Sequence, residues 1–202
     1  MSREKIIQNR INGSKLAFSA AFSAALVLIH ISLYSCVSAS GKNQPHVYFT
    51  NKAKYILLPA SGIENPMDMA HYISASFQDQ KYFFNAWVKA DKTGIEMTML
   101  NDLGVSMGIL SYRDGFISLS SPVFPDSMQP EYIIADFQLC FYNPGLLRKE
   151  LGKIGLVFEA NETTRRILNS GNAIIEIEKT KSAVRLTNNF RGYSYFIEGD
   201  FQ

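Results

Sequence analysis

Alternation of apolar and polar residues through the middle of this chain is the feature that most constrains its fold. In 95–99, the side chains of Ile95, Met97 and Met99 fall on one face of an extended segment, with polar residues between them. The preceding segment, 81–89, is rich in aromatic residues, which favour strands. A period of two predicts strands that bury one face, and it excludes long helices from this part of the chain.

Short turn sequences at 91–94, 101–104 and 113–115 divide this region into hairpins, and the Asp-Gly pair in the third is a strong hairpin signal. A further strand is expected at 116–120 because Pro122 follows it. The strand after the second turn is expected to place three side chains on one face: Val105, Met107 and Ile109.

The spacing of apolar residues then changes to that of a helix over 131–141, and a second short helix is expected at 144–151, where a proline opens it. The last third returns to short segments of strand character: 156–159, 165–168, 173–179, 183–186 and 193–198. Strands this short and evenly spaced favour a barrel or half-barrel. The expected fold class is therefore mainly β (α+β), with antiparallel strands, two helices and further antiparallel strands.

The N-terminus has the order of a secretion signal, in which a basic stretch precedes an apolar run over 16–33 and then Cys36. The basic residues are Arg3, Lys5, Arg10 and Lys15. The sequence Leu33-Tyr34-Ser35-Cys36 resembles the bacterial lipobox, in which the cysteine thiol receives diacylglycerol. Tyr34 departs from that pattern, where a small residue is usual. We expect a signal peptide at 1–35, a lipidated tether at 36–51 and a domain at 52–202.

Two other interpretations of this segment stay open. The apolar run is close to the roughly 20 residues that span a bilayer, so it is also compatible with an uncleaved anchor. Ser19, Ser23, His30 and Ser32 dilute its hydrophobicity and favour cleavage. The second alternative is that Cys36 is an ordinary thiol.

Removal of the signal changes the charge of the chain. Of its 20 basic and 18 acidic residues, four basic and one acidic lie in 1–35, so 16 basic and 17 acidic residues remain. No basic run survives in that part, which argues against nucleic acid as a partner. Cys140 is the only other cysteine and lies in an apolar stretch, which predicts a buried, unpaired thiol.

No catalytic or metal-binding motif is present in the sequence. Beyond His30, the histidines His46 and His71 are far apart and have no ligand-type neighbours at metal-binding spacing. Asp136 and Cys140 are one helical turn apart, but no histidine is near them in sequence to activate the thiol. We therefore expect neither an enzyme nor a cofactor.

Aromatic residues and methionines on the alternating strands and the first helix are candidates for the lining of an apolar cavity. Methionine is flexible and polarizable, which suits a pocket for variable apolar ligands. The candidate residues are Phe83, Trp87, Met97, Met99, Met107, Ile109, Phe137 and Phe141. The alternative is that these side chains fill a closed core.

Several short sequences resemble LolA/LolB-like outer-membrane lipoproteins. The segments 97–100, Leu103-Gly104, 108–110 and Asp114-Gly115 resemble the central hairpin of that group. Leu57-Leu58-Pro59, the run 184–188 and Gly192-Tyr193 are similar to features of an uncharacterised LolB-like lipoprotein family linked to aryl-polyene and fatty-acid biosynthesis loci. The resemblance covers roughly residues 56–201.

This resemblance implies an open antiparallel half-barrel with two short helices covering its mouth, and an apolar hollow that receives acyl chains. It also implies a position at the periplasmic face of the outer membrane, which Val37 after the lipidated cysteine favours over retention in the inner membrane. The expected function is binding or passing an acyl chain, polyene lipid or lipoprotein. The alternative is a structural accessory lipoprotein of an envelope complex with a closed core.

Overall fold

The computed structural model describes residues 44–77, 80–124 and 128–201, which belong to one compact unit. The expected signal peptide at 1–35 and the expected lipidation site Cys36 lie outside the described residues. No helix in the described part of the chain combines the length and the apolar character that crossing a bilayer requires.

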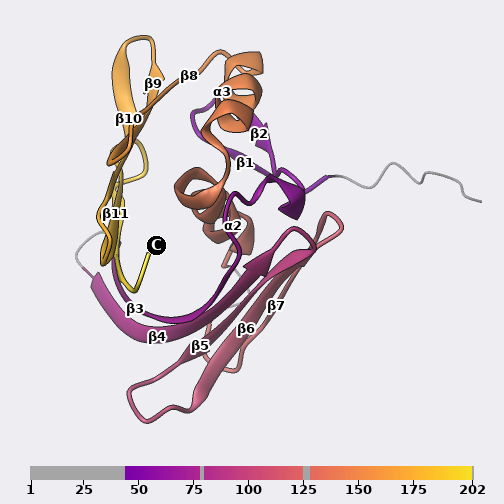
Figure 1. Ribbon diagram of the computed structural model, residues 1–202, viewed down its shortest axis with the longest axis vertical. Helices are drawn as coiled ribbons and strands as arrows, with labels where there is room; N and C mark the ends of the chain where they lie inside the picture. The colour runs from indigo at the N-terminus through magenta and orange to yellow at the C-terminus, as the bar shows by residue number, and fades with distance from the viewer. Residues whose placement is uncertain (1–43, 78–79, 125–127, 202) are drawn as a thin grey trace, which may run out of the picture. The chain divides into compact units, whose positions relative to one another are not determined.

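Ten antiparallel strands form one open sheet in which the middle and the last third of the chain meet (Figure 1). The strands are β3 (Met67–Phe77), β4 (Gln80–Asp91), β5 (Gly94–Leu100), β6 (Ser106–Arg113), β7 (Phe116–Ser120), β8 (Val157–Ala160), β9 (Thr164–Asn169), β10 (Asn172–Lys179), β11 (Ala183–Asn188) and β12 (Tyr193–Glu198). Their spatial order is β7-β6-β5-β4-β3-β12-β11-β10-β9-β8. The pairing of β12 with β3 joins the two halves, and the sheet does not close into a barrel. The predicted fold class is confirmed.

The period-two pattern of the sequence corresponds to the burial of the strands. In β5, Ile95, Met97 and Met99 are buried on one face, as the alternation predicted. In β4 the buried face consists of Ala86, Val88 and Ala90. Small residues on this face leave space beside the sheet, because an alanine side chain extends only one carbon from the backbone.

Strand β6 differs from its prediction, because its buried face carries Gly108, Leu110 and Tyr112. The register shifts between Met99 and Leu100, so that Met99 pairs with Gly108 and Leu100 with Ser106. The extra residue, Met107, is a β-bulge that leaves the regular alternation. Val105 and Ile109 are exposed, so the predicted three-residue face is wrong: only Met107 is half-buried.

The first residues of the unit form elements that the sequence did not reveal: β1 (His46–Tyr48), β2 (Lys54–Ile56) and the 3-10 helix η1 (Ala60–Gly62). β1 and β2 pair in a small sheet of their own, and Val47 and Phe49 are buried. The ring of Phe49 packs against that of Tyr55, with 5.0 Å between centroids. The expected tether at 36–51 is therefore wrong in its second half, because two apolar side chains anchor this polar stretch in the domain.

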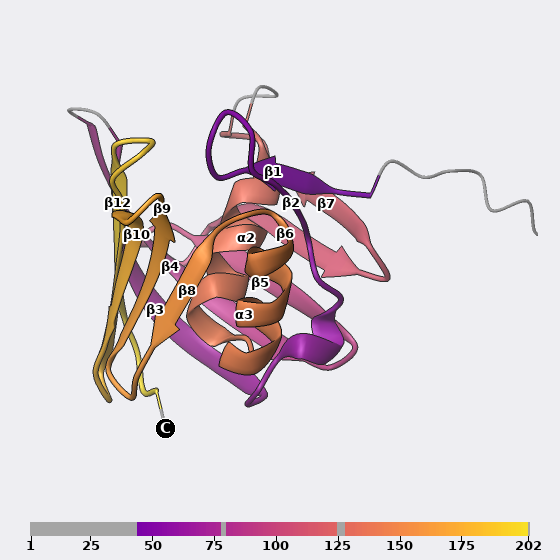
Figure 2. The same cartoon turned by 90° about the horizontal axis from the view of Figure 1, so that it is seen from above.

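Two helices connect the halves of the sheet, α2 (Pro130–Phe141) and α3 (Pro144–Lys153), close to their predicted bounds. Figure 2 shows both helices between the β5–β7 part and the β8–β12 part of the sheet. Asn143 caps α3, since its side-chain oxygen accepts a hydrogen bond from the backbone N–H of Leu146 at 3.1 Å. Leu147 and Leu151 of α3 are fully buried.

Helix α2 is buried on all sides over its last eight residues, from Ile134 to Phe141. The side chain of Gln138, which is fully buried, accepts hydrogen bonds from the Tyr55 hydroxyl at 3.0 Å and from the Leu58 N–H at 3.1 Å. It also donates to the Leu58 carbonyl at 2.7 Å. These bonds join α2 to the segment after β2 and satisfy a polar side chain that would be costly to bury alone.

Two cations from the last third of the sheet stabilise the C-terminal end of α2. The Arg165 guanidinium donates to the carbonyls of Leu139 and Tyr142 at 2.9 and 2.8 Å, and the Lys179 ammonium donates to that of Cys140 at 3.2 Å. The last carbonyls of a helix have no partner within it and carry partial negative charge. Burial lowers the pKa of both cations, but the carbonyls supply acceptors for their hydrogen atoms.

Substitution of Arg165 tests whether these hydrogen bonds stabilise the C-terminal end of α2. Arg165→Met removes two charge-assisted hydrogen bonds and leaves two buried carbonyls unpaired, so the free energy of unfolding should fall by about 3 kcal/mol in urea titrations. The neighbouring Arg166→Met is the matched control, because Arg166 is exposed and its ion pair with Glu176, at 3.4 Å, lies on the surface. It should cost less than about 1 kcal/mol. An equal decrease in the free energy of unfolding in the two variants would contradict the role of Arg165 in holding the end of α2.

Candidate functional site

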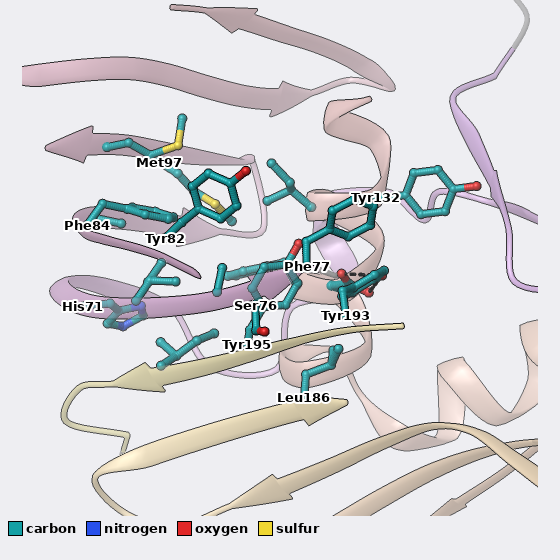
Figure 3. Close-up of a pocket in the computed structure, with 18 of the residues that line it drawn as sticks. His71, Ser76, Phe77, Tyr82, Phe84, Met97, Tyr132, Leu186, Tyr193 and Tyr195 are labelled. Carbon is teal, nitrogen blue, oxygen red and sulfur yellow. Dashed lines mark hydrogen bonds between the residues drawn. The ribbon is translucent and has the colours of Figure 1, made fainter. Parts of the chain in front are cut away.

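An apolar hollow of about 1010 Å³ lies between α2 and the inner face of the sheet. Its volume is at the upper end of the range for small-molecule sites, roughly 300–1,000 Å³. Figure 3 shows Phe84 and Met97 on one side of this space and Tyr195 and Leu186 on another. The hollow exists because β4 contributes the small Ala86 to its wall while α2 is held at a distance by its hydrogen bonds.

The helix and the sheet supply the two long walls of the hollow. From α2 come Tyr132, Ile133, Asp136, Phe137, Cys140 and Phe141, which recur every three or four residues and so share one face of the helix. From β3 come His71, Ile73 and Ala75, which alternate along the strand. Facing residues on β12 are Tyr193, Tyr195 and Ile197. Tyr193 contacts Asp136 towards one end, and His71 and Phe141 both pack against Phe201 towards the other, so both walls extend along the hollow.

The two ends of the hollow differ in their access to solvent. At the open end, Phe77, Tyr82, Phe83 and Phe190 are each 45–54% exposed. At the inner end, His71 is 3% exposed and Phe141 is 9% exposed. The hollow thus opens to solvent beside the hairpin ends of the sheet.

Six of the eight residues predicted from the sequence line the hollow: Phe83, Met97, Met99, Met107, Phe137 and Phe141. Trp87 and Ile109 do not, so these two assignments are wrong. Both side chains are exposed on the opposite face of the sheet, because the neighbours of Trp87 in β4, Ala86 and Val88, occupy the inner face. The Trp87 indole N–H donates instead to the Asp68 carboxylate at 2.8 Å.

Sequence reasoning missed the contributions of β3 and β12 to the site. The inner face of β3 reads His71, Ile73, Ala75 and Phe77, in which a histidine and a small residue interrupt the apolar pattern. The second half of that strand nevertheless carried a usable signal, since Ser74 and Ser76 alternate with the inner-face residues. The lining residue Tyr195 belongs to a strand that was predicted but not connected with the cavity.

Asp136 places a carboxyl group on the wall of this apolar space. Its side chain is 5% exposed, and its two oxygens are 2.8 and 3.1 Å from the Tyr193 hydroxyl, which donates to them. Burial raises the pKa of Asp136 to about 7, against the opposing effects of the Tyr193 hydrogen bond and the Arg191 charge. Asp136 in turn raises the pKa of Tyr193 and of Tyr195, together with burial.

The other polar groups of the lining are a histidine and a cysteine at the inner end. Burial lowers the pKa of His71 to about 4, and its Nε2 atom has no hydrogen-bond partner among the described residues. Cys140 is a free, buried thiol, as predicted, and burial raises its pKa to about 12. Such a thiol is not a nucleophile at neutral pH. The described residues contain no cluster of metal-binding side chains.

A family model described as "Protein of unknown function (DUF3261)" matches residues 68–199. The chain belongs to the DUF3261 family. The match covers the whole ten-stranded sheet except the first residue of β3, and it includes α2 and the hollow. A comparison of this DUF3261 chain with curated proteins gave no match.

The buried carboxyl of Asp136 in this DUF3261 protein makes stability depend on pH. The unfolded carboxyl has a pKa of 3.8, whereas the folded one keeps its proton up to about pH 7. Folded protein therefore binds more protons between these values, and stability falls as pH rises from about 4 to 7. Asp136→Asn removes this loss, so over that window the variant should gain on the order of a few kcal/mol relative to wild type.

The measurement is the difference in unfolding free energy between the two proteins, from urea titrations at pH values from 4 to 8. His71 titrates in the opposite sense, because its lowered pKa removes stability as pH falls from 6.5 to about 4, but it is present in both proteins and cancels. A difference that stays constant with pH would contradict the assignment to Asp136.

Proposed function

We propose that this protein is a lipoprotein, anchored through Cys36 at the periplasmic face of the outer membrane, that binds or passes a hydrophobic ligand. The ligand class is an acyl chain, a polyene lipid or the acyl chains of a lipoprotein. The observation that supports this function best is the hollow of about 1010 Å³, which is apolar along both walls and open at one end.

The energetics of lipid transfer explain why an open apolar hollow matters. Moving an acyl chain out of a membrane costs about 0.8 kcal/mol per CH₂ group, or on the order of 10 kcal/mol for a chain of roughly 14 carbons. A polar surface cannot offset this cost, whereas a largely enclosed apolar space can. The aromatic and methionine lining, including Phe137, Met97 and Met99, has the required character.

A second observation concerns the turn between β5 and β6. In the LolB proteins that this hairpin resembles, a leucine on a protruding loop helps to deliver cargo to the membrane. Leu103 is 87% exposed at this turn, and the Asn101 side chain accepts hydrogen bonds from the backbone N–H groups of Leu103 and Val105 at 3.0 and 2.9 Å. Since Leu100 pairs with Asn85, the turn lies at the same end of the sheet as Tyr82 and Phe83.

Filling the hollow should abolish ligand binding without a change of fold. Ala75 lines the hollow from β3, so Ala75→Trp should exclude an acyl chain, whereas Ala70→Trp places the same ring on the exposed face of the same strand. The proteins are secreted with a cleavable signal in place of 1–35 and with Cys36→Ser, then purified without detergent. Lipid mass spectrometry should find bound lipid in the parent and in Ala70→Trp, and at least about tenfold less in Ala75→Trp.

The opposite result has a clear meaning. Absence of bound lipid from the parent protein, with no uptake of fluorescent acyl probes, would overturn the ligand-binding function. A stoichiometric protein partner found by crosslinking in intact cells would then favour the structural alternative.

Exposed Leu103 should influence exchange with membranes. Leu103→Asp loses the burial of one large apolar side chain, worth roughly 1.5–3 kcal/mol, so the rate of acyl-probe transfer to vesicles should fall about tenfold or more. Leu103→Phe keeps an apolar side chain and should retain the rate. An unchanged transfer rate in Leu103→Asp would show that this turn takes no part in exchange with membranes.

The lipid anchor is tested by intact mass and fractionation of the full chain in a Gram-negative host. The mature protein should begin at Cys36, carry the mass of a diacylglyceryl group and additional acyl chain, and fractionate with the outer membrane. Cys36→Ser should lose that mass. A protein that retains residues 1–35 with an unmodified thiol would instead be a transmembrane-anchored form.

A further inference from the structure

Asp136 lies partway along the hollow, on the α2 wall, and it is the acidic residue among the described lining. Its hydrogen-bond partner Tyr193 pairs with Phe77 at the open end of the hollow, so Asp136 stands nearer the open end than the inner end. Tyr193 faces it from β12 and donates to both of its oxygens (Figure 3). The carboxyl group is therefore a fixed polar point on the α2 wall, and the other polar groups described above, His71 and Cys140, lie at the inner end.

The hydrogen-bonding capacity of this carboxyl group is largely unused within the described residues. An ionised carboxylate has about four acceptor sites on its two oxygens. The Tyr193 hydroxyl carries one hydrogen atom, which it shares between Oδ2 at 2.8 Å and Oδ1 at 3.1 Å. No other described group donates to the side chain of Asp136, although a buried carboxylate needs several donors to offset its burial.

The cation whose charge acts on Asp136, Arg191, does not supply the missing donors. Arg191 lowers the pKa of Asp136 through its charge, but the two form no ion pair among the described residues. The guanidinium donates instead to the Tyr48 carbonyl at 2.8 Å and to the Tyr132 hydroxyl. It also lies over the Tyr132 ring, 4.2 Å from its centroid. Arg191 is thus committed to holding the start of α2 beside β1.

Beyond Asp136 the hollow continues inward between mainly apolar side chains as far as His71 and Cys140. Tyr193 and Ile197 both line it, and Ile197 lies four positions after Tyr193 along the strand, which corresponds to roughly 13 Å. Phe137 and Phe141 accompany this stretch on the helix side, 4.9 Å apart between ring centroids. An extended chain that lies in this part of the hollow has its polar end next to Asp136.

We propose that the hollow selects amphiphiles with a hydrogen-bond donor, a hydroxyl or an amine, beside the apolar chain, and that Asp136 accepts that donor. This inference rests on the proposed ligand-binding function and narrows its ligand class. A methyl ester of the same chain has only acceptors and leaves the carboxyl unsatisfied. A fatty carboxylate places a second negative charge beside it, which disfavours binding further.

Competition with matched 12-carbon compounds tests the proposal. The detergent-free protein is loaded with the apolar dye N-phenyl-1-naphthylamine at pH 8 and titrated with dodecan-1-ol, dodecylamine, methyl laurate or laurate. Hydrogen bonds to charged groups are worth about 1.5–3 kcal/mol, so the alcohol and amine should displace the dye roughly tenfold more tightly than the ester. Asp136→Leu should bind all four compounds with similar affinity.

Two further variants distinguish the loss of a hydrogen bond to Asp136 from a change in the shape of the hollow. Asp136→Asn keeps the side-chain size but loses the charge, so the preference for the amine should fall most. Phe137→Ala should weaken the binding of all four compounds in parallel.

If the dye binds but the four compounds compete equally in the parent protein, the donor selectivity is wrong and the ligand-binding function stands. Selectivity that persists in both Asp136 variants also overturns the inference, and failure of the dye and all compounds to bind overturns the ligand-binding function with it.

Discussion

Helix α2 is held in place by buried polar contacts, and the rest of the site depends on them. Gln138 fixes one side of the helix to the segment after β2, and Arg165 and Lys179 bind the carbonyls at its C-terminal end. Apolar packing alone would favour collapse of the helix onto the sheet, because contact is non-directional and excludes the most water. Directional hydrogen bonds set its distance instead, and a hollow of about 1010 Å³ remains between helix and sheet.

The inner side chains and the strand order of the sheet also favour an open interior. Strand β4 presents Ala86 and Val88 to the hollow, and β3 adds Ala75, so short side chains form part of its floor. Larger aromatic residues line the hollow at its open end, on α2 and on β12, which contributes Tyr193 and Tyr195. The pairing of β3 with β12 brings the walls together while the outer strands β7 and β8 remain unpaired with each other. Such a sheet curves without closing, and the space stays accessible at one end.

Much of this architecture was accessible from the sequence because it depends on local patterns. Nine of the ten strands of the large sheet and both α-helices were located, since alternation, turn residues and helical spacing are properties of neighbouring residues. The bulge at Met107 and the buried Val47 were not, because each depends on a strand pairing, β5 with β6 and β1 with β2, whose register no local pattern in the sequence specified. The methionines of the predicted lining were assigned correctly to the hollow, whereas Trp87 and Ile109 were placed on the wrong face.

The sequence by itself determined the mainly β class, the order of elements and an apolar character for the candidate lining, because periodicity and composition are properties of residues close together in the chain. Tertiary structure decided that the lining surrounds a space rather than filling it. It also decided that Asp136 faces that space with one donor from β12, a contact between residues 57 positions apart. Burial, hydrogen-bond partners and a shifted pKa belong to a three-dimensional environment, and no local pattern specifies them.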